Sequence, residues 1–257
     1  MKRRIHNMKK ILSLFLISII TFFGSLINNV KANEEPPSST FIDSFEEDIT
    51  GDGLREYFKL QGRYLAEDSN YYQDIWLEIT SPFAKEWSIS FKGGYDPKLT
   101  LYDLNHDQVF DLLYEVALDE DKERFFTQAY SLKKGKVEQI ELPSNNYIKG
   151  EYLDDFRIAL TLHANEDPIF IPVKNRQQLI DNKLYDTNGK ILKEESIVVD
   201  PIKKFIPTLI SESKGYGLKS IQEINGVFDE DRIGSIETLW YYDKNKWIIL
   251  QNNWKPQ

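Results

Sequence analysis

Residues 48–64 read DITGDGLREYFKLQGRY, an Asp- and Gly-rich loop that runs directly into an alternating segment. From Phe58 to Tyr64, apolar and polar side chains alternate with the period of two that places one face of a β-strand on a core. Asp and Gly are typical of tight turns. This stretch therefore predicts a β-strand that is entered through an acidic loop.

Short alternating segments recur along the rest of the chain, and helical periodicity is weak. Turn sequences at 92–94, 133–136 and 243–246 separate several of these segments and predict hairpins, which imply antiparallel sheet. Residues 175–184 are the best candidate for a helical turn or two. The segments expected to form strands are 56–64, 74–80, 86–92, 98–103, 110–118, 205–210, 218–228, 233–242 and 246–254.

The N-terminal residues 1–32 have the features of a signal peptide. Lys9 and Lys10 precede an uncharged apolar run over residues 11–26, and Val30-Lys31-Ala32 places small residues at the −3 and −1 positions of a cleavage site. A retained membrane anchor is the alternative, but the apolar run is shorter than the roughly 20 residues that span a bilayer. The sequence thus predicts a secreted protein, extracellular or associated with a cell wall.

The composition limits the partners and the source of stability. The chain contains no cysteine, so neither a disulfide nor the lipid anchor of a bacterial lipoprotein is expected, and export without cysteine suits a Gram-positive bacterium. Without residues 1–32 the chain keeps 26 basic and 41 acidic residues. Such an acidic protein is not expected to bind nucleic acid, or a membrane once the signal peptide is removed.

About 220 residues remain after export, enough for one large core or two small ones. Residues 33–39 are polar and proline-containing and are expected to form a flexible leader. Turn-forming residues cluster at 143–150 and suggest a boundary there. The predicted organisation is a β region with two acidic loops at 40–143, followed by a C-terminal antiparallel β region at 144–257.

The first acidic loop, residues 48–56, has the oxygen spacing of a calcium loop. Side-chain oxygens fall at positions 1, 3, 5 and 9, and Gly53 at position 6 permits a sharp turn. Calcium takes six to eight oxygen ligands, and the carbonyl of position 7 supplies another. The expected ligands are Asp48, Thr50, Asp52, Leu54 through its carbonyl, and Glu56.

The second acidic loop, residues 103–111, repeats these oxygen positions 55 residues later. Gln108 stands where the first loop has glycine, so a positive φ there would be strained and the site weaker. His106 is expected at the surface, pointing away from the ion. The expected ligands are Asp103, Asn105, Asp107, Val109 through its carbonyl, and Asp111.

Over residues 42–142 the two loops resemble FG-GAP or VCBS repeats, in which short Asp-rich calcium loops join the blades of a β-propeller. The chain also resembles VCBS-repeat-like secreted proteins of bacilli. This resemblance implies that each loop holds one calcium ion. A complete propeller would need more residues, so the expected all-β fold has two blade-like antiparallel sheets and a further β region.

A non-enzymatic, calcium-stabilised binding or structural module is the leading functional prediction, with a cell-wall polysaccharide or a surface protein as partner. One alternative is a cell-wall hydrolase that uses paired carboxylates, for example among residues 119–121 or at Asp154 and Asp155. The other is a plain secreted β domain whose acidic loops are empty turns. The Ser-x-x-Lys match at Ser211 lacks the companion motifs of penicillin-binding proteins.

Overall fold

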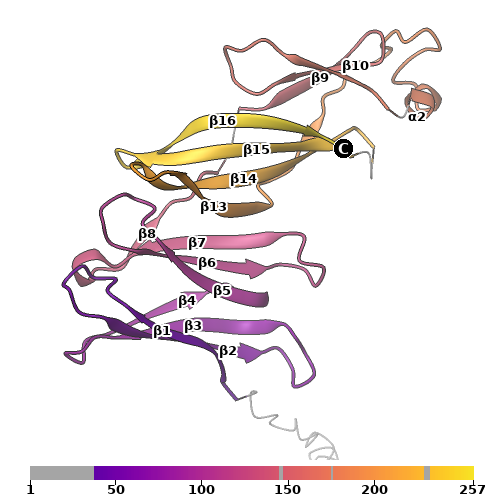
Figure 1. Cartoon of the computed structure of the whole chain (residues 1–257). Helices are drawn as coiled ribbons and strands as arrows, with labels where there is room; N and C mark the ends of the chain where they lie inside the picture. The colour runs from indigo at the N-terminus through magenta and orange to yellow at the C-terminus, as the bar shows by residue number, and fades with distance from the viewer. Residues whose placement is uncertain (1–37, 145–146, 175, 229–231) are drawn as a thin grey trace, which may run out of the picture. The chain divides into compact units, whose positions relative to one another are not determined.

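The computed structural model of the chain describes residues 38–144, 147–174, 176–228 and 232–257 (Figure 1). The predicted signal peptide at 1–32 lies outside the described residues, as does nearly all of the predicted leader. Within the described ranges no helix is long and apolar enough to cross a membrane.

Antiparallel β-structure makes up nearly all of the regular structure, which confirms the predicted fold class. The 3-10 helix η1 is Lys133–Gly135 and the short helix α2 is Arg176–Asp181, inside the segment expected to be helical. The strands are β1 Thr40–Glu47, β2 Glu56–Tyr64, β3 Tyr72–Thr80, β4 Glu86–Phe91, β5 Tyr95–Tyr102, β6 Asp111–Ala117, β7 Phe125–Ser131, β8 Glu138–Ile140, β9 Lys149–Leu153, β10 Arg157–Thr161, β11 Ile169–Pro172, β12 Val198–Val199, β13 Lys204–Ser211, β14 Gly215–Asn225, β15 Arg232–Asp243 and β16 Lys246–Pro256.

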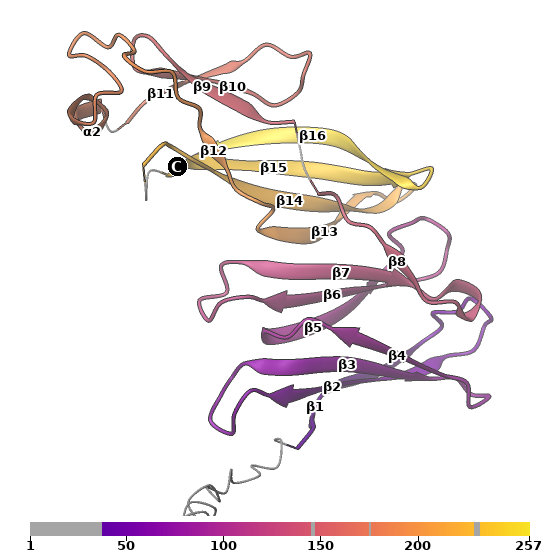
Figure 2. The same cartoon turned by 180° about the vertical axis from the view of Figure 1, so that it is seen from behind.

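Within the described ranges the strands form four sheets, which do not make a complete propeller. The first two sheets are four-stranded meanders in chain order, β1-β2-β3-β4 and β5-β6-β7-β8. A three-stranded sheet has the order β11-β10-β9, and a five-stranded sheet has the order β12-β14-β15-β16 with β13 also paired to β14 (Figure 2). The hairpins predicted at 133–136 and 243–246 are confirmed, because β7 pairs with β8 and β15 with β16.

The hairpin predicted at residues 92–94 is wrong, because these residues lead from the first sheet into the second. β4 pairs with β3, whereas β5 pairs with β6. A Cβ on Gly93 would lie 2.3 Å from the carbonyl oxygen of Tyr72, and one on Gly94 would lie 2.5 Å from the carbonyl oxygen of Ala117. The two glycines therefore allow the close backbone approach that the change of sheet requires.

The core between the first two sheets is built from their alternating apolar residues. Phe58 and Leu77 contribute from the first sheet and Leu112 and Tyr114 from the second. The rings of Phe91 and Tyr114 stack with centroids 4.1 Å apart. Burial of one face explains the alternation of buried and more exposed residues along β3 in the first sheet.

Strand β6 is buried on both faces. Leu112 and Tyr114 belong to the core shared with the first sheet, and Leu113 belongs to a second core together with Leu218 and Trp240 of the five-stranded sheet. The sequence of β6, DLLYEVA, accordingly lacks the alternation of a half-exposed strand.

A third core joins the three-stranded sheet, α2 and the other end of the five-stranded sheet, where Leu160, Leu179 and Ile236 are all buried. Between the two cores that meet the five-stranded sheet lies a buried polar strip of Ser220, Gln222 and Thr238. Each residue of the strip forms a hydrogen bond. Ser220 accepts from the indole N–H of Trp240 at 2.8 Å, Gln222 donates to the carbonyl of Asp200 at 3.1 Å, and Thr238 donates to Asn252 at 2.7 Å.

Truncation of a side chain in the first core tests the packing. Leu77 is fully buried, whereas Leu65 is 56% exposed. Leu77→Ala should lower the free energy of unfolding by about 2–5 kcal/mol, because it removes buried methyl groups and leaves a cavity. Leu65→Ala should change it by less than about 0.5 kcal/mol. Urea unfolding of both variants measures the difference, and equal losses would contradict the assigned core.

Candidate functional site: two acidic loops

The two acidic loops occupy the same place in the two four-stranded sheets. Residues 48–56 join β1 to β2, and residues 103–111 join β5 to β6, so each loop connects the first strand of a meander to the second. Position 9 of each loop, Glu56 or Asp111, is also the first residue of the second strand. The 55-residue interval in the sequence thus corresponds to one structural unit.

The carboxylate at position 1 ties each loop together through backbone N–H groups. Asp48 accepts hydrogen bonds from Gly51 at 2.7 Å and from Gly53 at 2.8 Å. In the second loop, Asp103 accepts from Asp107 and from Gln108, both at 3.0 Å. These bonds hold the turn closed around the first side chain.

In both loops the carboxylate at position 5 accepts a hydrogen bond from the backbone N–H of position 7. Asp52 Oδ1 accepts from the N–H of Leu54 at 2.9 Å, and Asp107 Oδ1 accepts from the N–H of Val109 at 3.0 Å. Each is an Asx-turn that fixes the chain just before the strand.

The carboxylate at position 9 is buried and accepts from the backbone at position 2. Glu56 accepts from the N–H of Ile49 at 3.1 Å, and Asp111 accepts from the N–H of Leu104 at 2.9 Å. The same carboxylates bond to the side chains at position 3. Thr50 donates its hydroxyl to Glu56 at 3.3 Å, and Asn105 donates its amide to Asp111 at 3.1 Å.

Backbone angles follow the same pattern. At position 4, Gly51 has φ +74° and His106 has φ +62°, and at position 6, Gly53 has φ +88° and Gln108 has φ +70°. The left-handed conformation expected for Gln108 is confirmed, and it is a less favourable one than for glycine.

Both position-9 carboxylates have raised pKa values. Burial raises the pKa of Asp111 to about 7, against the lowering effect of the N–H groups of Leu104 and Asn105. Burial also raises the pKa of Glu56, and the bond from Ile49 opposes it. Among the described residues neither carboxylate forms an ion pair, so each relies on neutral donors that compensate only part of the desolvation.

His106 is not the free surface residue that the sequence suggested. Its ring stacks on Tyr241 of β15 with centroids 4.5 Å apart, and a Cβ on Gly215 would lie 3.3 Å from its Nδ1. Burial lowers the pKa of His106, and Lys214 lowers it further, while Asp103 and Asp243 raise it. The second loop therefore packs on the five-stranded sheet.

The two loops also contact each other and share the turn at η1. A Cβ on Gly51 would lie 2.7 Å from Cγ2 of Val109, so the loops are in close contact at that point. The N–H of Lys134 donates to the carbonyl of Thr50 at 2.9 Å, and the ammonium of Lys133 donates to the carbonyl of Asp107 at 2.7 Å. One turn therefore bonds to both loops.

The structure brings together some of the ten predicted ligands. Thr50 bonds to Glu56 and Asn105 to Asp111, whereas Leu54 at position 7 is 38% exposed. His, Asp and Glu side chains in the described ranges form no group of three or more that could hold a metal ion. In the conformation described, the loops are closed by hydrogen bonds of their own.

Sequence reasoning missed the apolar residue at position 2. Ile49 and Leu104 are fully buried and belong to different cores. The signal was present, because each loop carries a large aliphatic residue between two polar ones. The hydrogen bond from the ammonium of Lys133 to the second loop could not be predicted from a local pattern, since Lys133 lies 26 residues from Asp107.

Comparison with known proteins gives a family match over part of the chain and assigns no activity. Residues 146–255 match the family described as the YybI C-terminal domain. The match begins within the turn-rich stretch 143–150, and both acidic loops lie outside it.

The chain is similar to the uncharacterized protein YybI of Bacillus subtilis (strain 168). The two are 21% identical over 234 residues, which cover 87% of this chain and 88% of that protein. Among solved structures, a Bacillus licheniformis rhamnogalacturonan lyase PL11 and the rhamnogalacturonan lyase YesW are each 12% identical, with TM-scores of 0.36 and 0.35. The matches cover 84% of this chain and 34% of each lyase chain, so this chain spans about a third of the lyases' length.

Two glycine substitutions test the contact between the loops. Gly51 and Gly53 both have positive φ, but only a Cβ on Gly51 would meet Val109, while one on Gly53 has open space. In EGTA, Gly53→Ala should cost about 1–2 kcal/mol of unfolding free energy from backbone strain alone. Gly51→Ala should cost about 1 kcal/mol more because of the clash.

Combining Gly51→Ala with Val109→Ala should cost less than the sum of the two single changes, since the smaller side chain makes room. Denaturant unfolding measures all four variants. Equal costs for the two glycine changes, with additive behaviour of the double variant, would show that the loops do not touch.

Proposed function

We propose that the protein is a secreted, calcium-binding β protein that acts as a binding or structural module, and that both acidic loops bind Ca²⁺. The observation that carries this proposal is the repetition of one loop design. Side-chain oxygens at positions 1, 3, 5 and 9 recur at the same place in two sheets, and positions 4 and 6 have positive φ in both loops. Four hydrogen bonds also recur: from the N–H of positions 5 and 6 to the side chain of position 1, from the N–H of position 7 to the side chain of position 5, and from the N–H of position 2 to the side chain of position 9.

The chemistry of the donors fits a hard cation. All the proposed side-chain ligands are carboxylate, hydroxyl or amide oxygens, which Ca²⁺ prefers. A carboxylate oxygen has two lone pairs, so Asp48 and Asp103 can accept a backbone N–H and still bind an ion. Because no acidic group of three is assembled among the described side chains, binding requires the side chains at positions 1, 3 and 5 to converge.

The role proposed for the ions is structural. The loops fix the start of β2 and β6, both of which belong to the first core. A cation that binds only the folded state stabilises that state by mass action. The resemblance of residues 42–142 to FG-GAP or VCBS repeats agrees with this role and stays a prediction, as does secretion.

Thermal unfolding in EGTA and then in excess CaCl₂ tests the proposal. Calcium should raise Tm, because filling one site at about 100 times its Kd adds about 2.7 kcal/mol. Asp52→Ala and Asp107→Ala should each reduce the rise, since each removes a ligand from one loop.

Asp186→Ala is the matched control. Asp186 also accepts backbone N–H bonds in a tight turn, from Asn188 at 2.8 Å and Lys190 at 2.9 Å, but its turn lacks the repeated spacing. This variant should be destabilised and keep the full calcium response. No calcium-dependent shift in the unsubstituted protein would mean that the loops are ordinary hydrogen-bonded turns.

A further inference from the structure

We propose a second binding site, for an anionic polysaccharide, in a hollow beside the second loop. The hollow has a volume of about 460 Å³ and is lined by the turn at η1, strand β8, the second loop and the β15–β16 hairpin. It falls within the usual size range of ligand sites, about 300–1,000 Å³. This site shares Asn105 and Asp107 with the second loop, but the proposal does not require calcium and is tested without it.

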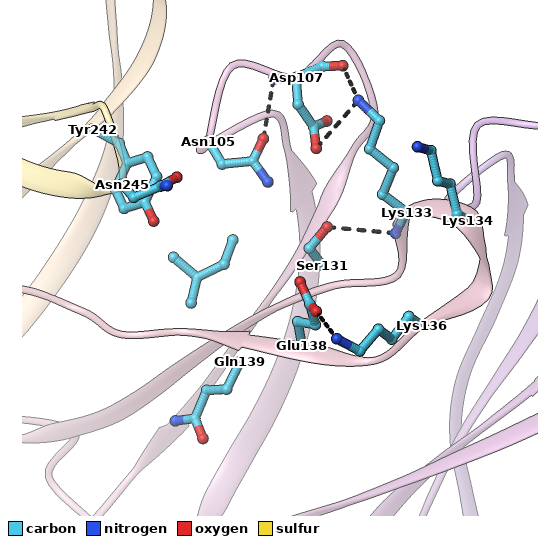
Figure 3. Close-up of a pocket in the computed structure, with 11 residues that line it drawn as sticks. Asn105, Asp107, Ser131, Lys133, Lys134, Lys136, Glu138, Gln139, Tyr242 and Asn245 are labelled. Atoms are coloured by element: carbon cyan, nitrogen blue, oxygen red, sulfur yellow. Dashed lines mark hydrogen bonds and ion pairs between the residues drawn. The ribbon is translucent and has the colours of Figure 1, made fainter.

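The positive charge of the hollow comes from one short turn. Lys133, Lys134 and Lys136 lie on one side of it, opposite Tyr242 and Asn245 (Figure 3). A fourth ammonium, that of Lys85, donates to the carbonyl of Gly135 at 3.3 Å from the other side of the same turn. Four lysines therefore gather at this turn, in a chain whose formal net charge is −9.

Not all of this charge is neutralised within the protein. The side chain of Lys134 is exposed and forms no hydrogen bond or ion pair within the described part of the chain. Lys133 lies 3.4 Å from a carboxylate oxygen of Asp107, and Lys136 pairs with Glu138. Partly exposed pairs of this kind are weak, so an incoming anion can compete for the two lysines.

The remaining lining suits hydroxyl groups. Asn105, Gln139 and Asn245 offer amide donors and acceptors around the hollow, and the carboxylates of Asp107 and Glu138 are acceptors only. Ile140 and the ring of Tyr242, which packs against Trp247 with centroids 5.1 Å apart, add apolar surface. A sugar unit presents the matching combination of an anionic group, several hydroxyls and an apolar ring face.

A saccharide fits this charge pattern better than nucleic acid does. The two carboxylates in the hollow and the net negative charge of the chain would repel a closely spaced row of phosphates. In a carbohydrate polymer the carboxylate or phosphate groups are further apart. One anionic group can then lie against the lysines, while sugar hydroxyls donate to Asp107 and Glu138. The shared chemistry is an anionic group on a polyhydroxylated chain.

Calorimetric titration of the full chain tests the site, with hyaluronate as a uronate polymer, sparsely phosphorylated dextran, neutral dextran and duplex DNA. The titrations are run at low salt, once in EGTA and once in CaCl₂. We expect binding of at least one anionic polysaccharide in EGTA, no binding of neutral dextran, and weaker binding as salt rises. Binding of hyaluronate alone identifies the carboxylate as the recognised group, and binding of phosphorylated dextran alone identifies the phosphate.

Two variants locate the binding. Lys134→Gln combined with Lys136→Gln should weaken it about tenfold, because charge-assisted bonds are lost. Asn245→Asp should weaken it through repulsion, and Asp tolerates the positive φ of 62° at that turn. The matched control is Lys183→Gln with Lys190→Gln, which removes the same charge from exposed positions, one of them with φ 59°.

The control pair should bind as the unsubstituted protein does, and all variants should keep its Tm within a few degrees. The proposal is overturned if neither anionic polysaccharide binds, if the control pair loses as much affinity as the lysine pair at η1, or if duplex DNA binds as tightly as the polysaccharide. Because one set of titrations is run in EGTA, polysaccharide binding there would support this site even if the loops bind no calcium. Loss of the calcium-dependent Tm shift, in contrast, would count only against the calcium sites.

Discussion

The second strand of each four-stranded sheet begins at a buried carboxylate, and the arrangement of both loops depends on it. Ile49 and Leu104 are fully buried, which takes their backbone N–H groups away from water at a point where no neighbouring strand can accept them. A buried N–H without a partner costs free energy comparable to a lost hydrogen bond. Glu56 and Asp111 supply the acceptors, so the aliphatic anchor and the acid seven residues later act as one unit.

The pairing of a buried aliphatic residue with a buried carboxylate affects more of the packing in the second sheet than in the first. Asp111 opens β6, the strand with apolar residues in two cores, and Leu104 itself lies in the core shared with the five-stranded sheet. The second loop also stacks His106 on Tyr241. A shift of this loop would therefore disturb packing on both sides of the second sheet, whereas Ile49 anchors the first loop in a single core.

The fold class, most strands and the spacing of the loops could be predicted because they depend on local patterns. The alternation of apolar and polar residues at 56–64 predicts a half-buried strand, and the glycine at position 53 predicts a positive φ. The connection between sheets at Gly93 and Gly94 could not be distinguished from a hairpin in the sequence. Glycine occurs both in turns and where two backbones approach closely, and only the pairing of strands shows which of the two applies. The place of His106 likewise depends on Tyr241, 135 positions further along the chain.

The two proposed sites are physically connected, because Asn105 and Asp107 belong to the second loop and also line the lysine-bearing hollow. A cation in that loop would neutralise the carboxylate of Asp107 and weaken its hold on Lys133, which leaves more positive charge for an anion. Linkage is reciprocal, so an anion at the lysines would raise the affinity of the loop for a cation by the same factor. Among the described residues, the first loop has one hydrogen bond to the same turn, from the backbone N–H of Lys134 to the carbonyl of Thr50, so its coupling to the hollow should be the weaker of the two.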